Sequence, residues 1–480
     1  MSKQMQLFRR TLSADCFTPP GLFSRLVNRG DCFLFESAEG GEQWGRYSIL
    51  GISPACRATA KGKQTDLIFR DGHSETYPGD ILEWLREHVL DRSFLAEDDL
   101  PFAGGAVGYF GYQLVSRFED IPANLPDPVG APESACLLVD RFMVFDNLRG
   151  TLTCCVRLPS EQSCEAIKVL DGMELSLGEG EMARVLRLDA DTSQISAPQA
   201  QTTQEDFEEA VRKAREYILA GDIFQVVLSQ RFSRPLHCAP FDIYRAVRHI
   251  NPSPYLFYLH IGATILVGSS PEILVRRDME RAVVRPIAGT RPRGKTEAED
   301  KTLETELLAD AKERAEHVML VDLGRNDLGR VCQYGTVKLT SSMAVERYSH
   351  VMHIVSQVEG LLREDVDSLD LLAATFPAGT VSGAPKVRAM EIIHELEPVA
   401  RGPYAGTVGY IGFGGQRMDT CIAIRTAVIH GNEIHIQAGA GIVADSIPAN
   451  EHTECVNKAT AMFRAVALAE AQPVIQKELS

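Results

Sequence analysis

The stretch ATILVGSSPEILVRR, residues 263–277, contains two runs of aliphatic residues separated by Ser-Ser-Pro. Aliphatic and β-branched residues on either side of a short turn signal predict a strand, a turn and a second strand. Glu272 comes directly after the turn. We therefore expect this acid between the turn and the second strand.

Similar patterns lie on both sides of this stretch. CLLVDRFMVFDN (136–147) and GTLTCCVRL (150–158) alternate in a way that predicts antiparallel strands. DIFQVVLSQRF (222–232) predicts a strand with Phe224, Val226 and Leu228 on one face and Gln225 on the other. Long strand–helix–strand alternation is missing, so we expect an α+β protein with large antiparallel sheets and helices outside them.

The length of 480 residues exceeds what one ordinary core supports. Residues 188–204 are polar, unpatterned and rich in Ser, Thr, Gln and Asp, which is typical of a linker. We therefore expect an N-terminal domain over 1–187 and a C-terminal domain over 205–480.

A helix is predicted directly after this linker. Thr202 and Glu205 have capping-box spacing, and Gly221 is a suitable C-terminal residue. Between them, Phe207 and Val211 begin an apolar stripe at helical spacing.

The formal net charge of −16 makes nucleic acid an unfavourable partner. No apolar run is long enough to span a membrane, and the N-terminus lacks the apolar core of a secretion signal. The eleven cysteines are scattered without a C-x-x-C pair. We expect reduced thiols in a cytoplasmic protein, with neither a disulfide framework nor a zinc site.

Two predicted helices carry acids at helical spacing. In LLADAKERAEHVMLVDL (307–323), Glu313 and Glu316 share a face with Asp310. Such a pair is usually a solvated helix face, and that alternative stays open here. The motif DLGRNDLGR (322–330) follows at the end of this stretch. It is equally consistent with a structural ion-pair network and with a functional role.

The second acidic helix lies within SIPANEHTECVNKATAMF (446–463). Ser446 is a candidate cap, and Glu451, Glu454 and Lys458 share a face. It follows the glycine-containing strand IQAGAGIVADS, where the backbone can approach a ligand closely. Carboxylates without nearby cysteines favour a hard ion such as Mg²⁺, which shares itself with an anionic substrate.

FPAGTVSGAPKVRAMEII (376–393) places Thr380 and glycines ahead of a helix, whose free N–H groups suit a carboxylate or phosphate. It does not have Walker-loop spacing. His350 and His353 lie three apart without a matching acid motif, so a buried or substrate-facing histidine is favoured over a metal ligand. No cysteine lies in the glycine-flanked setting that glutaminases use.

Together with RPIAGTRPRG (285–294), RGPYAGTVGYIGF (401–413) and QAGAGIVADSIP (437–448), these motifs resemble the chorismate-utilising enzymes, and in particular their anthranilate-forming branch. The resemblance is strong over 205–468 and looser over 15–160. It implies two large antiparallel sheets packed as a sandwich with helices outside, a chorismate substrate and Mg²⁺ as cofactor.

The resemblance also implies roles for individual residues. Glu316 and Glu454 would bind the metal, supported by Glu313 and Glu451, while Glu272 would be the general acid and His353 would lie beside the ring. Further positions that match substrate-binding residues are Gln225, Ala288, Gly289, Thr290, Thr380, Tyr404, Arg425, Gly439, Ala440, Gly441 and Lys458.

Two positions bear on the reaction. Family members that add water carry a lysine base where Gln225 stands, and related aminodeoxychorismate synthases typically carry a lysine where Ala288 stands. The resemblance therefore implies that ammonia adds at C2 of chorismate, and that pyruvate loss then gives anthranilate. This lyase reaction is the first step of tryptophan biosynthesis, and a separate glutamine amidotransferase subunit (component II) would supply the ammonia.

FLFESAEGGEQWGRYSILG (33–51) resembles the family's tryptophan-binding element, through which tryptophan inhibits. Phe33 and Phe35 stand where leucines are common. The positions that match tryptophan contacts are Ser37, Arg46, Pro254, Tyr255, Leu256, Val408, Tyr410, Asp419 and Cys421. The alternatives are an aminodeoxychorismate synthase component I or another enzyme of this fold, and a non-catalytic tryptophan sensor.

Overall fold

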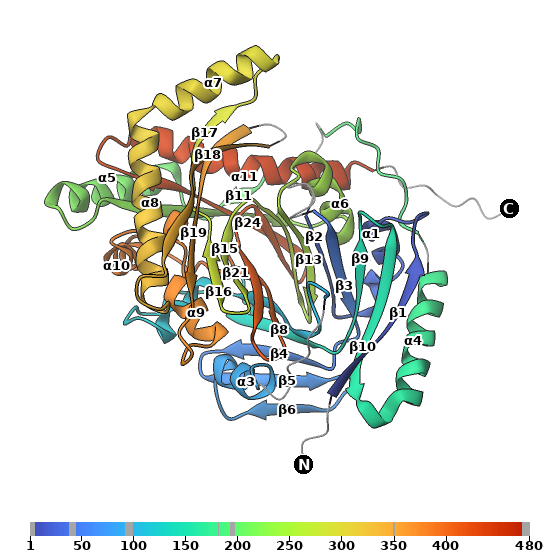
Figure 1. The fold of residues 1–480 in the computed structure, drawn as a ribbon. Helices are drawn as coiled ribbons and strands as arrows, with labels where there is room; N and C mark the ends of the chain where they lie inside the picture. The colour runs from blue at the N-terminus through green and yellow to red at the C-terminus, as the bar shows by residue number, and fades with distance from the viewer. Residues whose placement is uncertain are drawn as a thin grey trace.

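The computed structural model describes residues 5–37, 45–91, 99–180, 182–192, 197–348 and 351–472. Within these ranges the chain forms two large sheets with helices outside them (Figure 1). All strand pairs that define the sheets are antiparallel. The α+β architecture predicted from the sequence is confirmed.

The first sheet has twelve strands within the described residues. In spatial order they are β1 (Met5–Ser13), β10 (Thr151–Pro159), β9 (Arg141–Asp146), β3 (Tyr47–Ile52), β2 (Cys32–Glu36), β13 (Tyr255–Ile261), β14 (Thr264–Ser270), β23 (Thr426–His430), β24 (Glu433–Ile442), β12 (Gln225–Pro235) and β11 (Gln199–Ala200), with β20 (Gly383–Ala384) also pairing with β12.

The second sheet has the same number of strands in the described part of the chain. Its order is β17 (Ile287–Pro292), β19 (Val351–Leu361), β16 (Arg281–Val284), β15 (Ile273–Asp278), β22 (Arg417–Ile422), β21 (Thr407–Gly412), β7 (Gly105–Phe110), β8 (Ser134–Val139), β4 (Cys56–Lys61), β5 (Gln64–Phe69) and β6 (Ser74–Tyr77), with β18 (Lys338–Arg347) pairing with β19.

Helices cover the outer faces of both sheets (Figure 1). Against the first sheet pack α1 (Pro19–Phe23), α4 (Ser163–Gly178), α5 (Gln204–Ala220), α6 (Pro240–Ile250), α10 (Lys386–Leu396) and α11 (Pro448–Glu470). Against the second pack α3 (Ile81–His88), α7 (Glu297–Ala309), α8 (Ala311–Gly329) and α9 (Ser368–Thr375). Short 3-10 turns are η1 (Val27–Arg29), η3 (Tyr112–Arg117), η4 (Ser160–Gln162) and η5 (Gly379–Val381).

A hydrophobic layer joins the sheets. Phe33 and Ile49 of the first sheet pack with Val107, Leu137 and Val408 of the second. Alternation places the neighbouring side chains Leu34 and Leu50 on the outer face, beneath the helices. The sandwich therefore follows from strands with apolar residues on both faces.

Each sheet contains strands from both sides of the predicted linker. β2 pairs with β13 in the first sheet, and β7 pairs with β21 in the second. Segments 1–187 and 205–480 thus share both sheets, and the division into separate domains stays a prediction.

Four local predictions need correction. The N-cap of α5 is Thr203, which accepts from the Asp206 amide, and not Thr202. Asp310 is not on the acidic face of one long helix, because it ends α7 and caps α8 with its side chain. Phe224 precedes β12 and is 70% exposed, whereas Val226 and Leu228, which were predicted to share its face, are buried. Ser446 does not cap α11, since Ile447 occupies the N-cap position.

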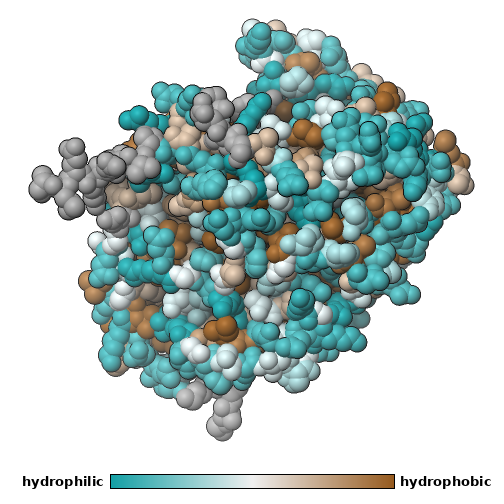
Figure 2. Space-filling view, turned by 180° about the vertical axis from the view of Figure 1, so that it is seen from behind, coloured by the Kyte–Doolittle hydropathy of each residue, from teal (hydrophilic) through white to brown (hydrophobic). Residues whose placement is uncertain are grey.

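The surface seen from behind is mostly hydrophilic, and its hydrophobic residues lie in small groups (Figure 2). Among the described residues, no helix combines the length and the apolar character that crossing a membrane requires. The eleven cysteines all lie within the described residues, and none of them forms a disulfide there.

Candidate active site

Glu272 lies between β14 and β15, directly after the predicted turn. The Thr380 hydroxyl, from turn η5, donates a 2.7 Å hydrogen bond to Glu272 Oε2. Burial raises the pKa of the Glu272 carboxyl, while Thr380, Arg425 and Lys458 oppose that rise. The carboxyl is therefore placed to hold a proton at a higher pH than an exposed glutamate holds one.

His353 lies on β19, and the charge of Arg425 acts on it as well as on Glu272. Its Nδ1 is 3.1 Å from the carbonyl oxygen of Gly289 and 3.0 Å from the Thr290 hydroxyl. Burial lowers the pKa of His353, which is 8% exposed, and Arg425 lowers it further. The imidazole is thus neutral near pH 7, and a proton on Nδ1 shared with Gly289 leaves Nε2 as an acceptor.

Arg425 itself has a left-handed backbone, with φ of 48°. A non-glycine residue rarely adopts this conformation, and such strain occurs often at functional sites. Its guanidinium charge acts on both Glu272 and His353.

Gln225 begins β12 and is 6% exposed. Its Nε2 donates a 3.3 Å hydrogen bond to Glu316 Oε1 on α8. Its Oε1 is buried without a hydrogen-bond partner among the described residues. A Cβ at Gly441 would lie 2.5 Å from Gln225 Nε2, so a larger residue there would require the Gln225 amide to move.

The four predicted glutamates come from α8 and α11. Burial raises the pKa of Glu316, and the charges of Glu313 and Glu454 raise it further. Burial likewise raises the pKa of Glu451, and Glu454 adds to the effect. The charges of the two acidic faces therefore act on one another.

This donor set fits a hard divalent cation. The carboxylates repel one another, and a cation such as Mg²⁺ would offset that repulsion through oxygen ligands. No three His, Cys, Asp or Glu side chains converge as a ready-made metal cage in the described ranges. Mg²⁺ typically takes one or two carboxylates and fills its other positions with water and substrate.

Lys458 connects this cluster to β24. Its Nζ lies 2.7 Å from Glu454 Oε1 and donates a 2.9 Å hydrogen bond to the Gly439 carbonyl. Gly439 is also constrained, because an added Cβ would lie 2.7 Å from the Tyr404 hydroxyl. Tyr404 is buried, and Glu272 contributes to the raised pKa of its phenol.

These contacts and charge interactions link most predicted site residues into one network. Ala288 and Thr290 belong to β17 beside His353, with a register shift between them. The Ala440 side chain is buried in the helix-facing core, so only its backbone can face a ligand. His350 lies outside the described residues. Within DLGRNDLGR, Asp327 pairs with Lys386 at 2.9 Å, and Asp322 pairs with Arg325 at 3.0 Å.

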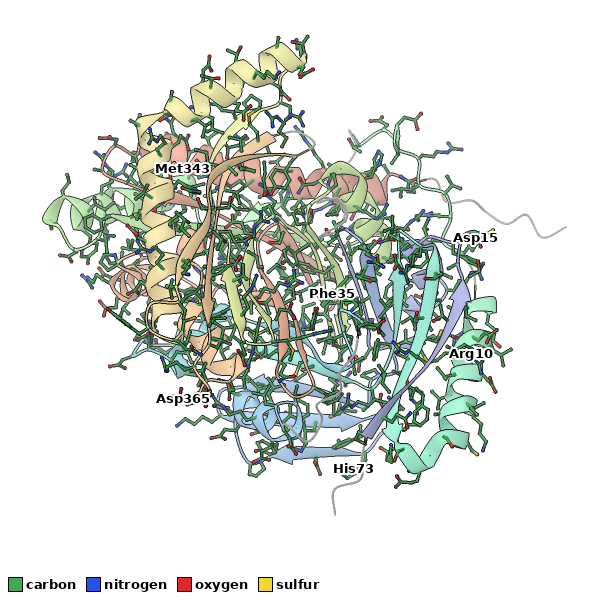
Figure 3. The ribbon with its side chains drawn as sticks, viewed as in Figure 1. Arg10, Asp15, Phe35, His73, Met343 and Asp365 are labelled. Carbon is green, nitrogen blue, oxygen red and sulfur yellow. The ribbon has the colours of Figure 1, made fainter. Side chains whose placement is uncertain are left out.

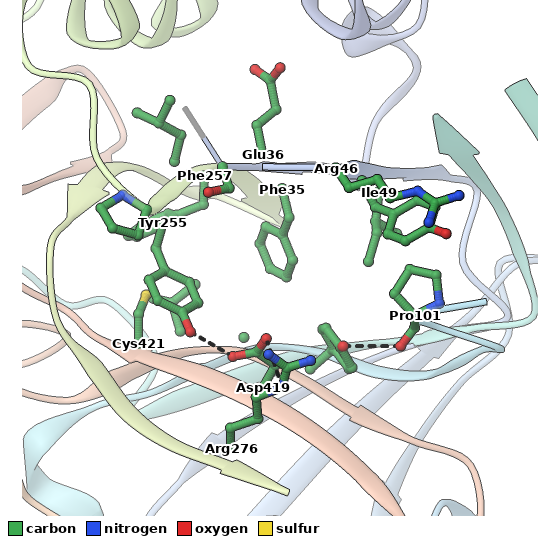
Figure 4. Close-up of a pocket in the computed structure, with 17 residues that line it drawn as sticks. Phe35, Glu36, Arg46, Ile49, Pro101, Tyr255, Phe257, Arg276, Asp419 and Cys421 are labelled. Carbon is green, nitrogen blue, oxygen red and sulfur yellow. Dashed lines mark hydrogen bonds and ion pairs between the residues drawn. The ribbon is translucent and has the colours of Figure 1, made fainter. Parts of the chain in front are cut away.

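A hollow lies between the two sheets, with a volume of about 800 Å³ including its mouth. All nine residues predicted to contact tryptophan line it: Ser37, Arg46, Pro254, Tyr255, Leu256, Val408, Tyr410, Asp419 and Cys421. Phe35 points into the hollow (Figure 4). In Figure 3, Phe35 lies near the middle of the molecule, whereas Met343 marks the region of α8 and β18.

Two tyrosine hydroxyls of the hollow donate hydrogen bonds to neighbouring groups. The Tyr255 hydroxyl donates a 2.8 Å hydrogen bond to Asp419, and the Tyr410 hydroxyl donates a 3.0 Å hydrogen bond to the Pro101 carbonyl. Burial raises the pKa of Asp419. Both acids and arginines border the space, as a ligand with an ammonium and a carboxylate group requires.

The sequence interpretation missed several lining residues: Glu36, Tyr47, Ile49, Pro101, Phe257, Arg276 and Gly409. Alternation along β2, β13 and β21 could have suggested some of them. Pro101 belongs to a loop that no periodic pattern connects to the hollow.

Comparison with known proteins identifies the family of this chain. A family model described as chorismate binding enzyme matches residues 30–464, and the chain belongs to this family.

Its curated relatives carry a more particular name. The chain is 48% identical over 467 residues to "Anthranilate synthase component 1" of Pseudomonas putida, covering 95% of this chain and 94% of the relative. The crystal structure of anthranilate synthase component I from Streptococcus pneumoniae superposes with a TM-score of 0.79 at 38% identity, covering 89% and 95% of the two chains. The menaquinone-specific isochorismate synthase of Escherichia coli, 21% identical with a TM-score of 0.72 over 97% and 95%, shares the fold.

Proposed function

We propose that this chain is the synthase component of an anthranilate synthase, which aminates chorismate at C2 and then eliminates pyruvate. The observation that carries the proposal is the buried Gln225 amide beside Glu316, where a base would be needed to add water. The names of the relatives support the same activity.

In the first step, Glu272 protonates the departing 4-hydroxyl. Thr380 occupies Oε2 of the carboxyl, so the transferable proton is carried by Oε1. Burial raises the Glu272 pKa and thereby keeps more of the acid protonated near neutral pH.

Ammonia is the nucleophile in this proposal. An uncharged amide cannot usefully deprotonate water, but ammonia needs no base to attack. The unpartnered Oε1 of Gln225 can accept an N–H bond and so orient the ammonia lone pair. The methyl group of Ala288 does not compete with ammonia for C2.

The carboxylates of Glu316 and Glu454 would hold Mg²⁺, with Glu313 and Glu451 close by. When bound, Mg²⁺ screens the ring carboxylate and draws electron density from the ring. The cationic groups of Lys458 and the neighbouring Arg425 suit the carboxylates of chorismate.

The second step removes the C2 proton as pyruvate leaves. His353 is suited to accept that proton, because its pKa is lowered by burial and Gly289 occupies Nδ1. The neutral Nε2 is then the basic atom of the ring. Aromatisation drives this elimination.

A separate glutaminase subunit would supply the ammonia. The word "component" in the names of the relatives supports a partner. Burial raises the pKa of thiols such as Cys238 and Cys455, which is the opposite of what a cysteine nucleophile needs. Cysteines that form no disulfide in the described residues support a location in the cytoplasm.

Tryptophan is the proposed ligand of the hollow between the sheets. Phe35, Tyr255 and Tyr410 offer ring surface to an indole, while Asp419 and Arg46 suit its ammonium and carboxylate groups. The hollow shares a strand ladder with the acid, since Cys421 pairs with Ile273 and the Ile422 amide donates to the Glu272 carbonyl at 2.9 Å. Feedback inhibition could act along this ladder.

The test supplies chorismate, Mg²⁺ and ammonium salt, and identifies the aromatic product. Ortho-aminobenzoate together with pyruvate supports the proposal. Salicylate, or the para isomer after lyase treatment, would instead assign another reaction of this fold. Binding of tryptophan without any turnover would assign a sensor.

A further inference from the structure

The ion pair Arg401–Glu397 lies behind the candidate site and is the most enclosed pair among the described residues. The two side chains are 1% and 5% exposed, and Arg401 Nη2 lies 2.6 Å from Glu397 Oε1. A second bond of 2.8 Å joins Arg401 Nε to Glu397 Oε2. This two-point contact fixes the plane of the guanidinium.

The other hydrogens of Arg401 reach two segments of the site. Nη1 donates to the Val381 carbonyl and Nη2 to the Val227 carbonyl, each at 2.7 Å. Val381 follows Thr380 in turn η5, and Val227 lies two residues after Gln225 on β12. One guanidinium therefore joins the turn that bears Thr380 to the strand that bears Gln225.

Glu397 and two aromatic rings complete this arrangement. Glu397 Oε1 accepts from the amide and hydroxyl of Ser229, both at 2.8 Å. The Tyr112 and Tyr404 rings lie 4.7 Å and 5.7 Å from the Arg401 guanidinium carbon. Burying two charges costs desolvation, and an apolar pair of similar volume often stabilises a fold equally well. An apolar pair does not provide directional hydrogen bonds to turn η5 and strand β12, as this ion pair does.

We propose that Arg401, oriented by Glu397, is a positioning residue that holds Thr380 against Glu272 and Gln225 beside Glu316. The inference rests on the proposed function, because it assigns Arg401 an effect on proton donation to chorismate. Arg401 touches neither substrate nor metal and acts through Thr380, Gln225 and Tyr404.

The test replaces the pair by apolar side chains of similar length, Arg401→Met with Glu397→Leu. The matched control is Arg234→Met with Glu470→Leu, a pair joined at 2.7 Å and 3% and 8% exposed, which links β12 to α11 at the far end of the strand. For each variant we would measure the melting temperature, kcat and KM for chorismate, and the dependence of kcat on pH.

We expect kcat of the Arg401/Glu397 variant to fall about 10- to 100-fold, because small misplacements of reacting groups have effects of this size. KM should change less than kcat. The alkaline limb of the pH profile should move upward, since the Thr380 bond that lowers the Glu272 pKa is loosened. The control should retain kcat and the pH profile of the parent.

A double-mutant cycle tests the route through Thr380. Adding Thr380→Val to the Arg401/Glu397 variant should cause no further shift of the alkaline limb. If the two changes acted independently, their shifts of the limb would add. A profile of the Arg401/Glu397 variant that coincides with the control's overturns the inference, whatever its melting temperature. If that variant fails to fold, Arg401→Lys, which keeps the charge but not the planar fork, is held to the same readouts.

The two proposals fail in different ways. A parental chain that releases no anthranilate from chorismate and ammonium overturns the proposed function and this inference together. An active parent with an unmoved profile in the variant overturns the positioning inference alone.

Discussion

The hydrogen bond from Thr380 to Glu272 supports a quantitative prediction about the pH dependence of kcat. Thr380→Val keeps the shape of the side chain and removes the 2.7 Å bond to Glu272 Oε2. A hydrogen bond to a charged group contributes about 1.5–3 kcal/mol. Losing this bond should therefore destabilise the ionised Glu272 carboxylate relative to the protonated acid by that amount, which raises the Glu272 pKa.

The sign follows from the role of the acid. The hydroxyl of Thr380 favours the ionised carboxylate, and its removal leaves the burial that already raises the pKa. Glu272 then stays protonated to higher pH, and the descending limb of the kcat profile moves to higher pH. Thr380→Ser is the matched control, because it keeps the hydroxyl.

The assay follows anthranilate fluorescence at saturating chorismate, with total ammonium adjusted so that free ammonia is constant at every pH. Saturation matters because kcat reports groups in the enzyme–substrate complex. A limb in Thr380→Val that coincides with that of the parent, or that moves to lower pH, would refute the assignment of Glu272 as the acid held by Thr380.

Three further predictions concern the metal, the effector and stability. Glu316→Gln should abolish turnover and also remove the rise in melting temperature that Mg²⁺ causes. In the parent, Mg²⁺ at about 100 times its Kd adds about 2.7 kcal/mol of stability, which for 480 residues raises the melting temperature by about 3 °C. Normal turnover in the variant would contradict the metal role. Ser37→Phe should relieve tryptophan inhibition and leave turnover intact, and an unchanged inhibition curve would mean that the effector site lies elsewhere. The Glu272→Gln variant should have the same melting temperature as the parent near pH 4.5, the ordinary pKa of the group. At higher pH the melting temperature of the variant should increasingly exceed that of the parent, because ionising the buried acid destabilises the parent. A difference in melting temperature that does not change with pH would argue against the raised pKa.

Local sequence patterns predicted the strands and the acidic helices well. Residues two apart share one face of a strand, and residues three or four apart share one face of a helix, so these spacings indicate which residues face a core. They failed at boundaries that side-chain hydrogen bonds decide. Asp310 has helical spacing with Glu313, yet its carboxylate accepts from the amides of Lys312 and Glu313 and so starts a new helix. Thr202 and Thr203 are chemically equal as caps, and only the turn of the preceding chain selects between them.

The sequence indicated candidate site residues but not the contacts among them. Thr380 was expected to bind a substrate carboxylate, whereas its hydroxyl donates to Glu272 in the structure. The two residues are 108 apart in the chain, and no local period relates them. The family resemblance could name both residues without indicating that one holds the other.

Arg401 illustrates a limit of a different kind. It lies four residues after Glu397, a spacing that on a helix surface usually means a weak, solvated ion pair. Here α10 already ends at Leu396, so the pair leaves the helix and turns inward. The signal that could have revealed it is a Glu–Arg pair of helical spacing placed beyond a helix end and directly before Gly402. The spacing of two charged residues in the sequence indicates whether they are neighbours. Whether their ion pair also positions other residues of a site depends on how deeply the pair is buried.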